Sequence, residues 1–117
     1  MRQDDCGGLE VEHRGTGQWI QAPYIPNSFV VNIGDMLERW TCGHYKATPH
    51  RVKNTSGKDR LSAPFFFDPN FNCIVKPLKQ FAESEEDENK WPPVKYGDYI
   101  LAKVFAVFPE LLNDALK

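Results

Sequence analysis

The sequence contains no long hydrophobic run, and none of its apolar stretches approaches the roughly 20 residues that a membrane span needs. Met1 is followed by the polar residues 2–5 (RQDD) with no apolar segment behind them, so no signal peptide is visible. We therefore expect a soluble, cytoplasmic protein that does not associate with membranes. Cysteine is also scarce, and three widely spaced residues do not make a disulfide framework, so we expect reduced thiols at Cys6, Cys42 and Cys73.

The chain has little net charge of either sign. Its 14 basic and 16 acidic residues give −2, and residues 81–90 alone hold five acids and one lysine, a net of −4. The other 107 residues therefore carry +2, without the clustered Lys and Arg that bind polyanions, which argues against a nucleic-acid partner. With 117 residues, of which 41% are hydrophobic, the chain has the size and the apolar content of a single domain.

Turn-forming residues separate short segments rich in β-branched and aromatic side chains over the first 80 residues. This spacing is typical of a sandwich or barrel of short strands. The run at 29–33 is continuously apolar, as expected of a strand covered on both faces. We expect strands at 9–12, 19–22, 29–33, 48–53 and 60–67.

The C-terminal part has a different pattern. Residues 98–108 place apolar side chains at helical spacing, and Pro109 should end that helix. We also expect helical turns at 35–40 and 110–116, and an acidic, solvated linker ahead of the C-terminal helix. The predicted architecture is mainly β, followed by this helix.

Three residues could converge in the sheet. In the strand at 48–53, alternation puts His50 on one face, and in the strand at 60–67 it puts Arg60 and Ser62 on one face. If the two strands are antiparallel neighbours, a histidine meets an arginine fork and a hydroxyl, a pair that suits a carboxylate. The alternative is that Arg60 points to water from the opposite face.

Other recognisable chemistry is missing from the sequence. It contains no P-loop, no G-x-S-x-G and no G-x-G-x-x-G. Cys42, His44 and His50 resemble part of a zinc site, but no CxxC or HxxxH pair accompanies them, so a zinc site is disfavoured.

Taken together, several ordered segments resemble the iron(II)- and 2-oxoglutarate-dependent oxygenases of the isopenicillin N synthase-like class. Each segment is weak evidence alone, but their order and density make the resemblance strong. It covers residues 3–78, and the YGDY of residues 96–99 is similar to the family's C-terminal helix. The matching segments are 3–11 (QDDCGGLEV), Trp19, 29–37 (FVVNIGDML), 39–41 (RWT), 45–52 (YKATPHRV) and 60–69 (RLSAPFFFDP).

The resemblance implies the C-terminal portion of a double-stranded β-helix, or jelly roll, that holds one iron in its mouth. His50 matches the family's second iron-binding histidine, while Arg60 and Ser62 match the R-x-S pair that binds the far carboxylate of 2-oxoglutarate. Asn32 and Asp35 match a structural turn. The implied cofactors are Fe²⁺ and the co-substrate 2-oxoglutarate.

The chain departs from the family in one respect. The H-x-D motif that supplies the other two iron ligands precedes the Q-D-D-x-G-G segment in the family, and no H-x-D occurs in these 117 residues. We expect Met1 to be an internal methionine of a longer enzyme. We expect a partial dioxygenase domain at 1–80, an acidic, Pro-containing linker at 81–95 and a helical segment at 96–117.

Two functions follow. The first is a dioxygenase that oxidises a small organic substrate, by hydroxylation or a related reaction, of which the isolated chain is an inactive part because one histidine cannot hold iron tightly. The second is a non-catalytic half-barrel that acts as a binding or interaction module. Neither the substrate nor the oligomeric state can be deduced from these residues.

Overall fold

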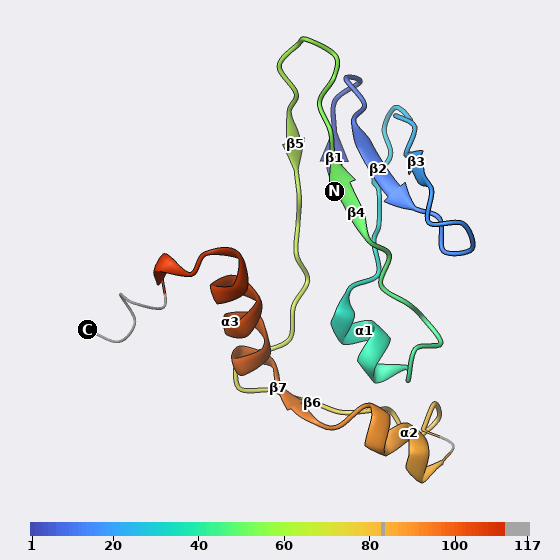
Figure 1. The fold of residues 1–117 in the computed structure, drawn as a ribbon, viewed down its shortest axis with the longest axis vertical. Helices are drawn as coiled ribbons and strands as arrows, with labels where there is room; N and C mark the ends of the chain where they lie inside the picture. The colour runs from blue at the N-terminus through green and yellow to red at the C-terminus, as the bar shows by residue number, and fades with distance from the viewer. Residues whose placement is uncertain (83, 112–117) are drawn as a thin grey trace. The chain divides into compact units, whose positions relative to one another are not determined.

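The computed structural model describes residues 1–82 and 84–111, which form two compact units (Figure 1). The first unit comprises residues 1–35 and 46–66, and the second comprises residues 36–45 and the chain from Phe67 onward. Within the described ranges, no helix is both long enough and apolar enough to cross a bilayer.

The first unit is built from five short strands in two antiparallel sheets. One sheet pairs β1 with β5, and the other has the order β3-β2-β4. The register pairs Gln3 with Ser62 in the first sheet and Val11 with His50 in the second. The strands are β1 (Arg2–Gln3), β2 (Leu9–Glu12), β3 (Trp19–Gln21), β4 (His50–Val52) and β5 (Ser62–Ala63).

The connections between these strands define the fold. β1 and β2 are consecutive but belong to different sheets, and so do β4 and β5 (Figure 1). Because β5 pairs with β1 while β4 pairs with β2, the two connected strand pairs run alongside each other from one sheet into the next. Two connected strand pairs that run side by side between two sheets are typical of a jelly roll, and this arrangement confirms the predicted fold class.

The strand β2 shows why the alternating LEVE segment forms a sheet. Its first residue, Leu9, is completely buried, whereas Glu10 points to the outer face and pairs with Arg51 of the neighbouring strand at 2.6 Å. The Arg51 guanidinium also lies over the ring of Trp19, 4.0 Å from its centroid. The outer face is therefore held by a charged and aromatic cluster across three adjacent strands.

One predicted strand is wrong. Residues 29–33 have no strand structure, and the side chains of Phe29 and Val31 are 69% and 86% exposed. Val30 exchanges two backbone hydrogen bonds with Met1, but no ladder continues from that pair within the described residues. An apolar run becomes a covered strand only when neighbouring strands satisfy its backbone, and here only a single residue does so.

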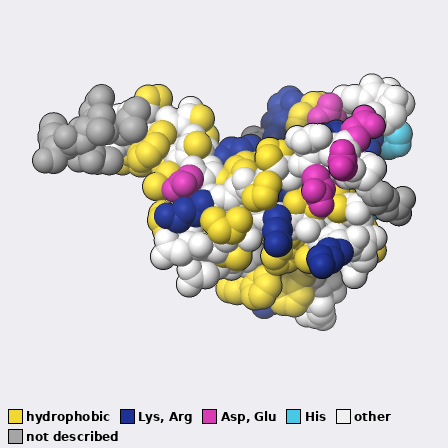
Figure 2. Space-filling model, turned by 90° about the horizontal axis from the view of Figure 1, so that it is seen from below, with side chains coloured by type: hydrophobic (Ala, Val, Ile, Leu, Met, Phe, Trp, Pro, Cys, Tyr) yellow, Lys and Arg dark blue, Asp and Glu magenta, His cyan; other side chains and the backbone are white. Residues whose placement is uncertain are grey.

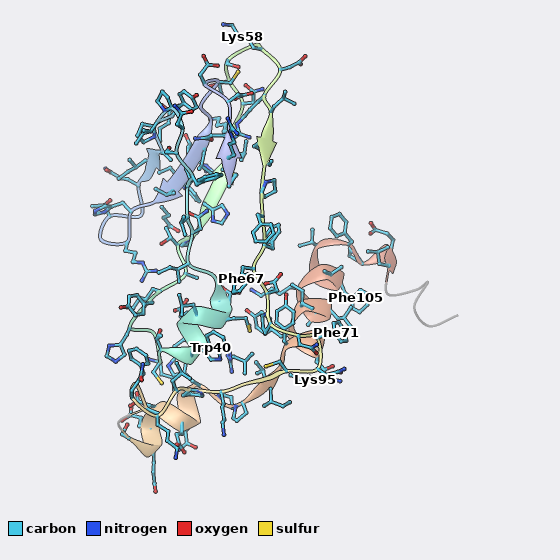
Figure 3. The ribbon with its side chains drawn as sticks, turned by 180° about the vertical axis from the view of Figure 1, so that it is seen from behind. Trp40, Lys58, Phe67, Phe71, Lys95 and Phe105 are labelled. Carbon is cyan, nitrogen blue, oxygen red and sulfur yellow. The ribbon has the colours of Figure 1, made fainter. Side chains whose placement is uncertain are left out.

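Among its described residues, the second unit contains the helices α1, α2 and α3 and one pair of short strands. Strands β6 and β7 are antiparallel, with Val75 completely buried, and β7 leads directly into α3. Tyr96 is 7% exposed. The Gly97 N–H donates to the Phe71 carbonyl at 2.8 Å, and Phe71 lies beside the C-terminal helix in Figure 3. The elements are α1 (Asp35–Trp40), β6 (Ile74–Val75), α2 (Glu85–Lys90), β7 (Val94–Lys95) and α3 (Tyr96–Val107).

Most of the other element predictions are confirmed. Strands form at the predicted 9–12, within 19–22 and within 48–53, α1 spans 35–40, and α3 ends just before Pro109. The strand expected at 60–67 is shorter, since β5 spans only Ser62–Ala63. The helical turn expected at 110–116 lies mostly outside the described residues.

The acidic segment predicted as a solvated linker contains α2 and β7. Ser84 caps α2, since its hydroxyl oxygen accepts the Asp87 N–H at 3.2 Å. Acidic residues in the first turn interact favourably with the helix dipole. A capped six-residue helix without an apolar stripe is hard to recognise from periodicity alone.

Gly8 lies in the turn that joins the two sheets, close to the backbone of Lys53. Its φ of +83° is in the left-handed region, and an added Cβ would lie 2.9 Å from the backbone oxygen of Lys53. Gly57 has a similar φ of +70°, but a Cβ there would meet nothing within 4 Å. The two glycines therefore share the conformational requirement and differ only in the contact.

We expect Gly8→Ala to lower the free energy of unfolding by about 1–3 kcal/mol more than Gly57→Ala does, because a backbone carbonyl cannot move aside. Urea unfolding of both variants and the unchanged protein measures the difference. Equal losses in the two variants would show that the contact at Gly8 is unimportant.

Candidate functional site

The guanidinium of Arg60 is fixed by three hydrogen bonds within the first unit. Its Nε donates to the Gly7 carbonyl at 2.7 Å, its Nη1 to Ser62 Oγ at 2.9 Å and its Nη2 to Gln3 Oε1 at 2.9 Å. Each acceptor comes from a different segment: the turn between the sheets, β5 and β1. The three bonds together fix both the position and the plane of the fork.

The pairing of β1 with β5 explains why these residues meet. Gln3 lies directly opposite Ser62 in the antiparallel register, and Arg60 is two residues before Ser62 in the chain. The structure therefore brings the predicted pair Arg60 and Ser62 together on one face, as alternation required. It also excludes the alternative in which Arg60 extends freely into water, because all three kinds of guanidinium nitrogen are bonded to the unit itself.

The acceptors around Arg60 are all neutral. The ion pairs recorded among residues 1–82 and 84–111 join Arg51 to Glu10 and Lys95 to Asp98, and neither includes Arg60. Asp4 lies nearby, but its carboxylate accepts the backbone N–H groups of Leu61 and Cys6. A half-buried guanidinium thus keeps its positive charge without a carboxylate bonded to it.

Asp4 clasps the backbone beside Arg60. Its N–H donates to the Leu61 carbonyl at 3.0 Å, and its carboxylate accepts the Leu61 N–H in return. The hydrogen bond from Leu61 holds the pKa of the Asp4 carboxyl below its ordinary value, with smaller help from the Cys6 N–H and the charge of Arg60, against a partial desolvation. Asp4 therefore stabilises the backbone conformation at Leu61, next to Arg60.

His50 is placed differently from the arginine pair. The condition that its strand be the antiparallel neighbour of the Arg60 segment is not met, because β4 pairs with β2 and β5 pairs with β1. The strands β4 and β5 belong to different sheets, so strand pairing does not join His50 to Arg60. No hydrogen bond among the described residues connects His50 with Arg60 or Ser62.

The imidazole of His50 has a defined tautomer. Its Nδ1 lies 3.0 Å from the Thr48 carbonyl oxygen, which can only accept, so Nδ1 carries the hydrogen. In the neutral imidazole Nε2 then carries the lone pair, and the side chain is exposed. A histidine that donates one ring N–H to a backbone carbonyl and presents the other nitrogen is the usual form of a metal-binding histidine.

A complete metal centre is not formed by the described residues. Nowhere in residues 1–82 and 84–111 do three His, Cys, Asp or Glu side chains gather closely enough to hold an ion. The three cysteines are free and half-buried, as predicted, and His44 packs against Phe81 with 5.4 Å between ring centroids. The candidate site in the described residues thus consists of the Arg60 guanidinium with Ser62, and of His50, which is not bonded to them.

Comparison with known proteins agrees with this arrangement. A family model described as the 2OG-Fe(II) oxygenase superfamily matches residues 1–69, more than half of the chain, and the chain belongs to this family of iron- and 2-oxoglutarate-dependent dioxygenases. Among its relatives is a Dictyostelium discoideum protein named "Probable iron/ascorbate oxidoreductase", 46% identical over 127 residues. Another is the homoarginine-6-hydroxylase 2-ODD-233 of Oryza sativa subsp. japonica, 41% identical over 107 residues.

Solved structures show the same fold. A Neurospora crassa protein crystallised with alpha-KG and 5-formyluracil aligns with a TM-score of 0.75 at 31% identity, over 90% of this chain. The rice dioxygenase for auxin oxidation aligns with a TM-score of 0.69 at 27% identity, over 89% of this chain.

The chain spans about a third of the proteins that it matches. It covers 34% of the Dictyostelium relative and 32% of the rice hydroxylase, although 99% and 92% of its own residues align with them. For the Neurospora and rice structures the shares of the solved chains are both 35%. The aligned region is therefore about a third of each of these longer proteins.

Some participants in the site were not singled out from the sequence. Gln3, the Gly7 carbonyl and Asp4 all contact Arg60 or its neighbour, but the sequence analysis used them only as part of a matching segment. A local signal existed for Asp4, since an aspartate that accepts the N–H two residues ahead forms a typical Asx turn. No local signal identifies Gln3, because its role depends on pairing with a strand some sixty positions later.

The lowered pKa of Asp4 makes stability depend on pH. Because the folded-state pKa lies below the unfolded value, the stabilisation is fully present above the unfolded pKa, near 3.8, and is lost as the pH falls through the folded pKa. We expect Asp4→Asn to be less stable than the unchanged protein at pH 7 and to lose less stability on acidification.

Chemical unfolding between pH 7 and pH 3 measures this difference. Asp5→Asn is the matched control, because Asp5 is exposed and no hydrogen bond to its carboxylate is recorded among the described residues. Parallel pH profiles for the unchanged protein and Asp4→Asn would contradict the role assigned to Asp4.

Proposed function

We propose that this chain supplies the 2-oxoglutarate-binding portion of an iron(II)-dependent dioxygenase that oxidises a small organic substrate. The observation that carries the proposal is that, among the described residues, the Arg60 guanidinium is bonded only to neutral acceptors. A guanidinium has five N–H donors, and the hydrogen bonds to Gly7, Ser62 and Gln3 use three. One N–H remains on each terminal nitrogen, and these two can be bridged by the two oxygens of one carboxylate.

The hydroxyl of Ser62 supports the same ligand. Its oxygen accepts a hydrogen bond from Arg60 Nη1, so its own hydrogen is available to a carboxylate that lies beside the guanidinium. Arg60 and Ser62 would then hold the far carboxylate of 2-oxoglutarate with one charge and three donated hydrogens. Relatives of the chain include proteins named as 2-oxoglutarate-dependent dioxygenases, and a structural neighbour is crystallised with alpha-KG.

His50 fits an iron ligand but does not complete a site. Its Nε2 lone pair is free to bind a metal, while a facial triad also needs a second histidine and a carboxylate. When bound, iron(II) and 2-oxoglutarate supply the activation of dioxygen, with 2-oxoglutarate losing carbon dioxide. His50 would donate one ligand nitrogen, and Thr48 would keep the imidazole in the required tautomer. We infer that the chain is inactive alone.

The class of substrate is proposed only broadly. The relatives are named for different small molecules, including 1-aminocyclopropane-1-carboxylate and homoarginine. A cytoplasmic location also stays a prediction.

The second candidate function is a non-catalytic binding module. It is favoured by the incomplete metal centre of the described residues and by exposed aromatic side chains after β5, with Phe65 and Phe66 82% and 77% exposed. Figure 2 shows hydrophobic side chains at the surface of one face. Such residues are suited to contacts with another segment or protein.

We expect Arg60→Ala to weaken 2-oxoglutarate binding by about 100-fold or more, equivalent to about 3 kcal/mol, because a bidentate charged pair is lost. Arg60→Lys should also bind poorly, since an ammonium keeps the charge but not the fork. Equilibrium dialysis of the purified protein with radiolabelled 2-oxoglutarate measures the affinity.

Lys58→Ala is the matched control for this experiment. Lys58 lies at the tip of the loop between β4 and β5 (Figure 3) and carries the same charge, but it does not belong to the fork. We expect its replacement to leave the affinity within about twofold. Equal losses in Lys58→Ala and Arg60→Ala would point to a general effect of charge and contradict the proposed site.

We expect the 117-residue chain to lose added iron(II) on desalting under anaerobic conditions, because a single imidazole is a weak ligand. Metal analysis of the desalted protein, with His50→Ala alongside, measures retention. One equivalent of iron retained by the chain and lost from His50→Ala would show that the chain does assemble a complete site.

A further inference from the structure

The amide of Gln3 contacts the fork of Arg60 from the side opposite Ser62 in the β1–β5 pairing. A guanidinium N–H can only donate, so the Gln3 atom that lies 2.9 Å from Nη2 is the amide oxygen. The orientation of the amide is thereby fixed, and the register places Gln3 directly across from Ser62. The arginine fork is thus held between two neutral oxygens on neighbouring strands.

The other end of the amide is also informative. Gln3 Nε2 is buried and has no hydrogen-bond partner among the described residues. The small cavity that Gln3 lines with Met1, Tyr24 and Val30 has a volume of about 10 Å³, room for about one water molecule. A buried amide nitrogen without a partner costs stability, so the Arg60 contact is the hydrogen bond recorded for this amide among the described residues.

Neutrality distinguishes glutamine from the acceptor that usually pairs with arginine. A carboxylate at 2.9 Å would hold the guanidinium equally well, but it would also neutralise the charge and compete for the terminal N–H groups. An amide oxygen fixes the fork through its dipole and leaves the full positive charge for a ligand. The same reasoning applies to the other two acceptors, the Gly7 carbonyl and the Ser62 hydroxyl.

We propose that Gln3 is a positioning residue for the carboxylate of 2-oxoglutarate: its neutral amide oxygen orients the Arg60 fork without cancelling its charge. Gln3 acts through Arg60. The inference rests on the proposed function, because it presumes that Arg60 binds this carboxylate.

Two substitutions separate geometry from charge. Gln3→Met has a similar length and no acceptor, so the fork loses one of its three anchors. Gln3→Glu keeps an acceptor of the same length and adds a negative charge. We expect equilibrium dialysis to show binding of radiolabelled 2-oxoglutarate weakened about tenfold in Gln3→Met and at least as much in Gln3→Glu.

A merely structural role would give a different pattern. If Gln3 only tied β1 to β5, Gln3→Glu would restore the anchor and bind 2-oxoglutarate like the unchanged protein. Gln18→Met is the matched control, since Gln18 is exposed in the turn before β3 and should leave binding unchanged. Urea unfolding midpoints of all the variants show whether a loss of binding exceeds any loss of folded protein.

The outcomes distinguish this inference from the function on which it rests. Binding by both Gln3 variants within twofold of the unchanged protein, with binding abolished in Arg60→Ala, overturns the role of Gln3 alone. Unchanged binding in Arg60→Ala overturns the proposed function as well. Weaker binding in Gln3→Met with normal binding in Gln3→Glu also overturns the proposal, because it shows that neutrality is unimportant.

Discussion

The hydrogen bonds of Arg60 connect parts of the first unit that are far apart in the sequence. Its guanidinium bonds to the Gly7 carbonyl in the turn, to Gln3 of β1 and to Ser62 of β5, and the backbone of the neighbouring Leu61 is hydrogen-bonded to Asp4. The positive charge that makes these bonds strong is not consumed by them, since each acceptor of the guanidinium is neutral. The same side chain therefore organises the unit and remains able to bind an anion.

The jelly-roll connections explain how one arginine can reach so many segments. Because β1 and β2 enter different sheets, the chain between them must turn sharply, and Gly7 and Gly8 adopt positive φ angles there. That turn brings the Gly7 carbonyl to Arg60 Nε and the Gly8 carbonyl to the Lys53 N–H at 2.8 Å. The positive φ angles that the turn requires thus place one of the three acceptors of Arg60, the Gly7 carbonyl.

Many apolar side chains of this chain are exposed, which agrees with the finding that it aligns with only about a third of each relative. Few side chains are fully buried among the described residues, whereas Phe29, Val31 and Phe65 are largely exposed. Exposed apolar side chains of this kind are suited to contacts with another segment or protein, and the chain spans about a third of each of these relatives. The incomplete set of metal-binding side chains fits the same interpretation.

Local rules in the sequence determined a good part of this protein. Alternation in LEVE predicted β2, and helical spacing before Pro109 predicted the end of α3. The two-residue separation of Arg60 and Ser62 put both on one face, and the ordered motifs were sufficient to indicate the oxygenase family. These features depend on residues close together in the chain, where periodicity and turn chemistry operate.

Only the tertiary structure decided what depends on pairing between distant segments. It separated the His50 strand from the Arg60 strand, left residues 29–33 without a ladder and placed Gln3 against the guanidinium. Strand partners are chosen by burial and backbone hydrogen bonding across the whole fold, so neighbours in sequence need not be neighbours in a sheet. The acceptors of Arg60 are therefore a property of the fold rather than of the R-x-S motif.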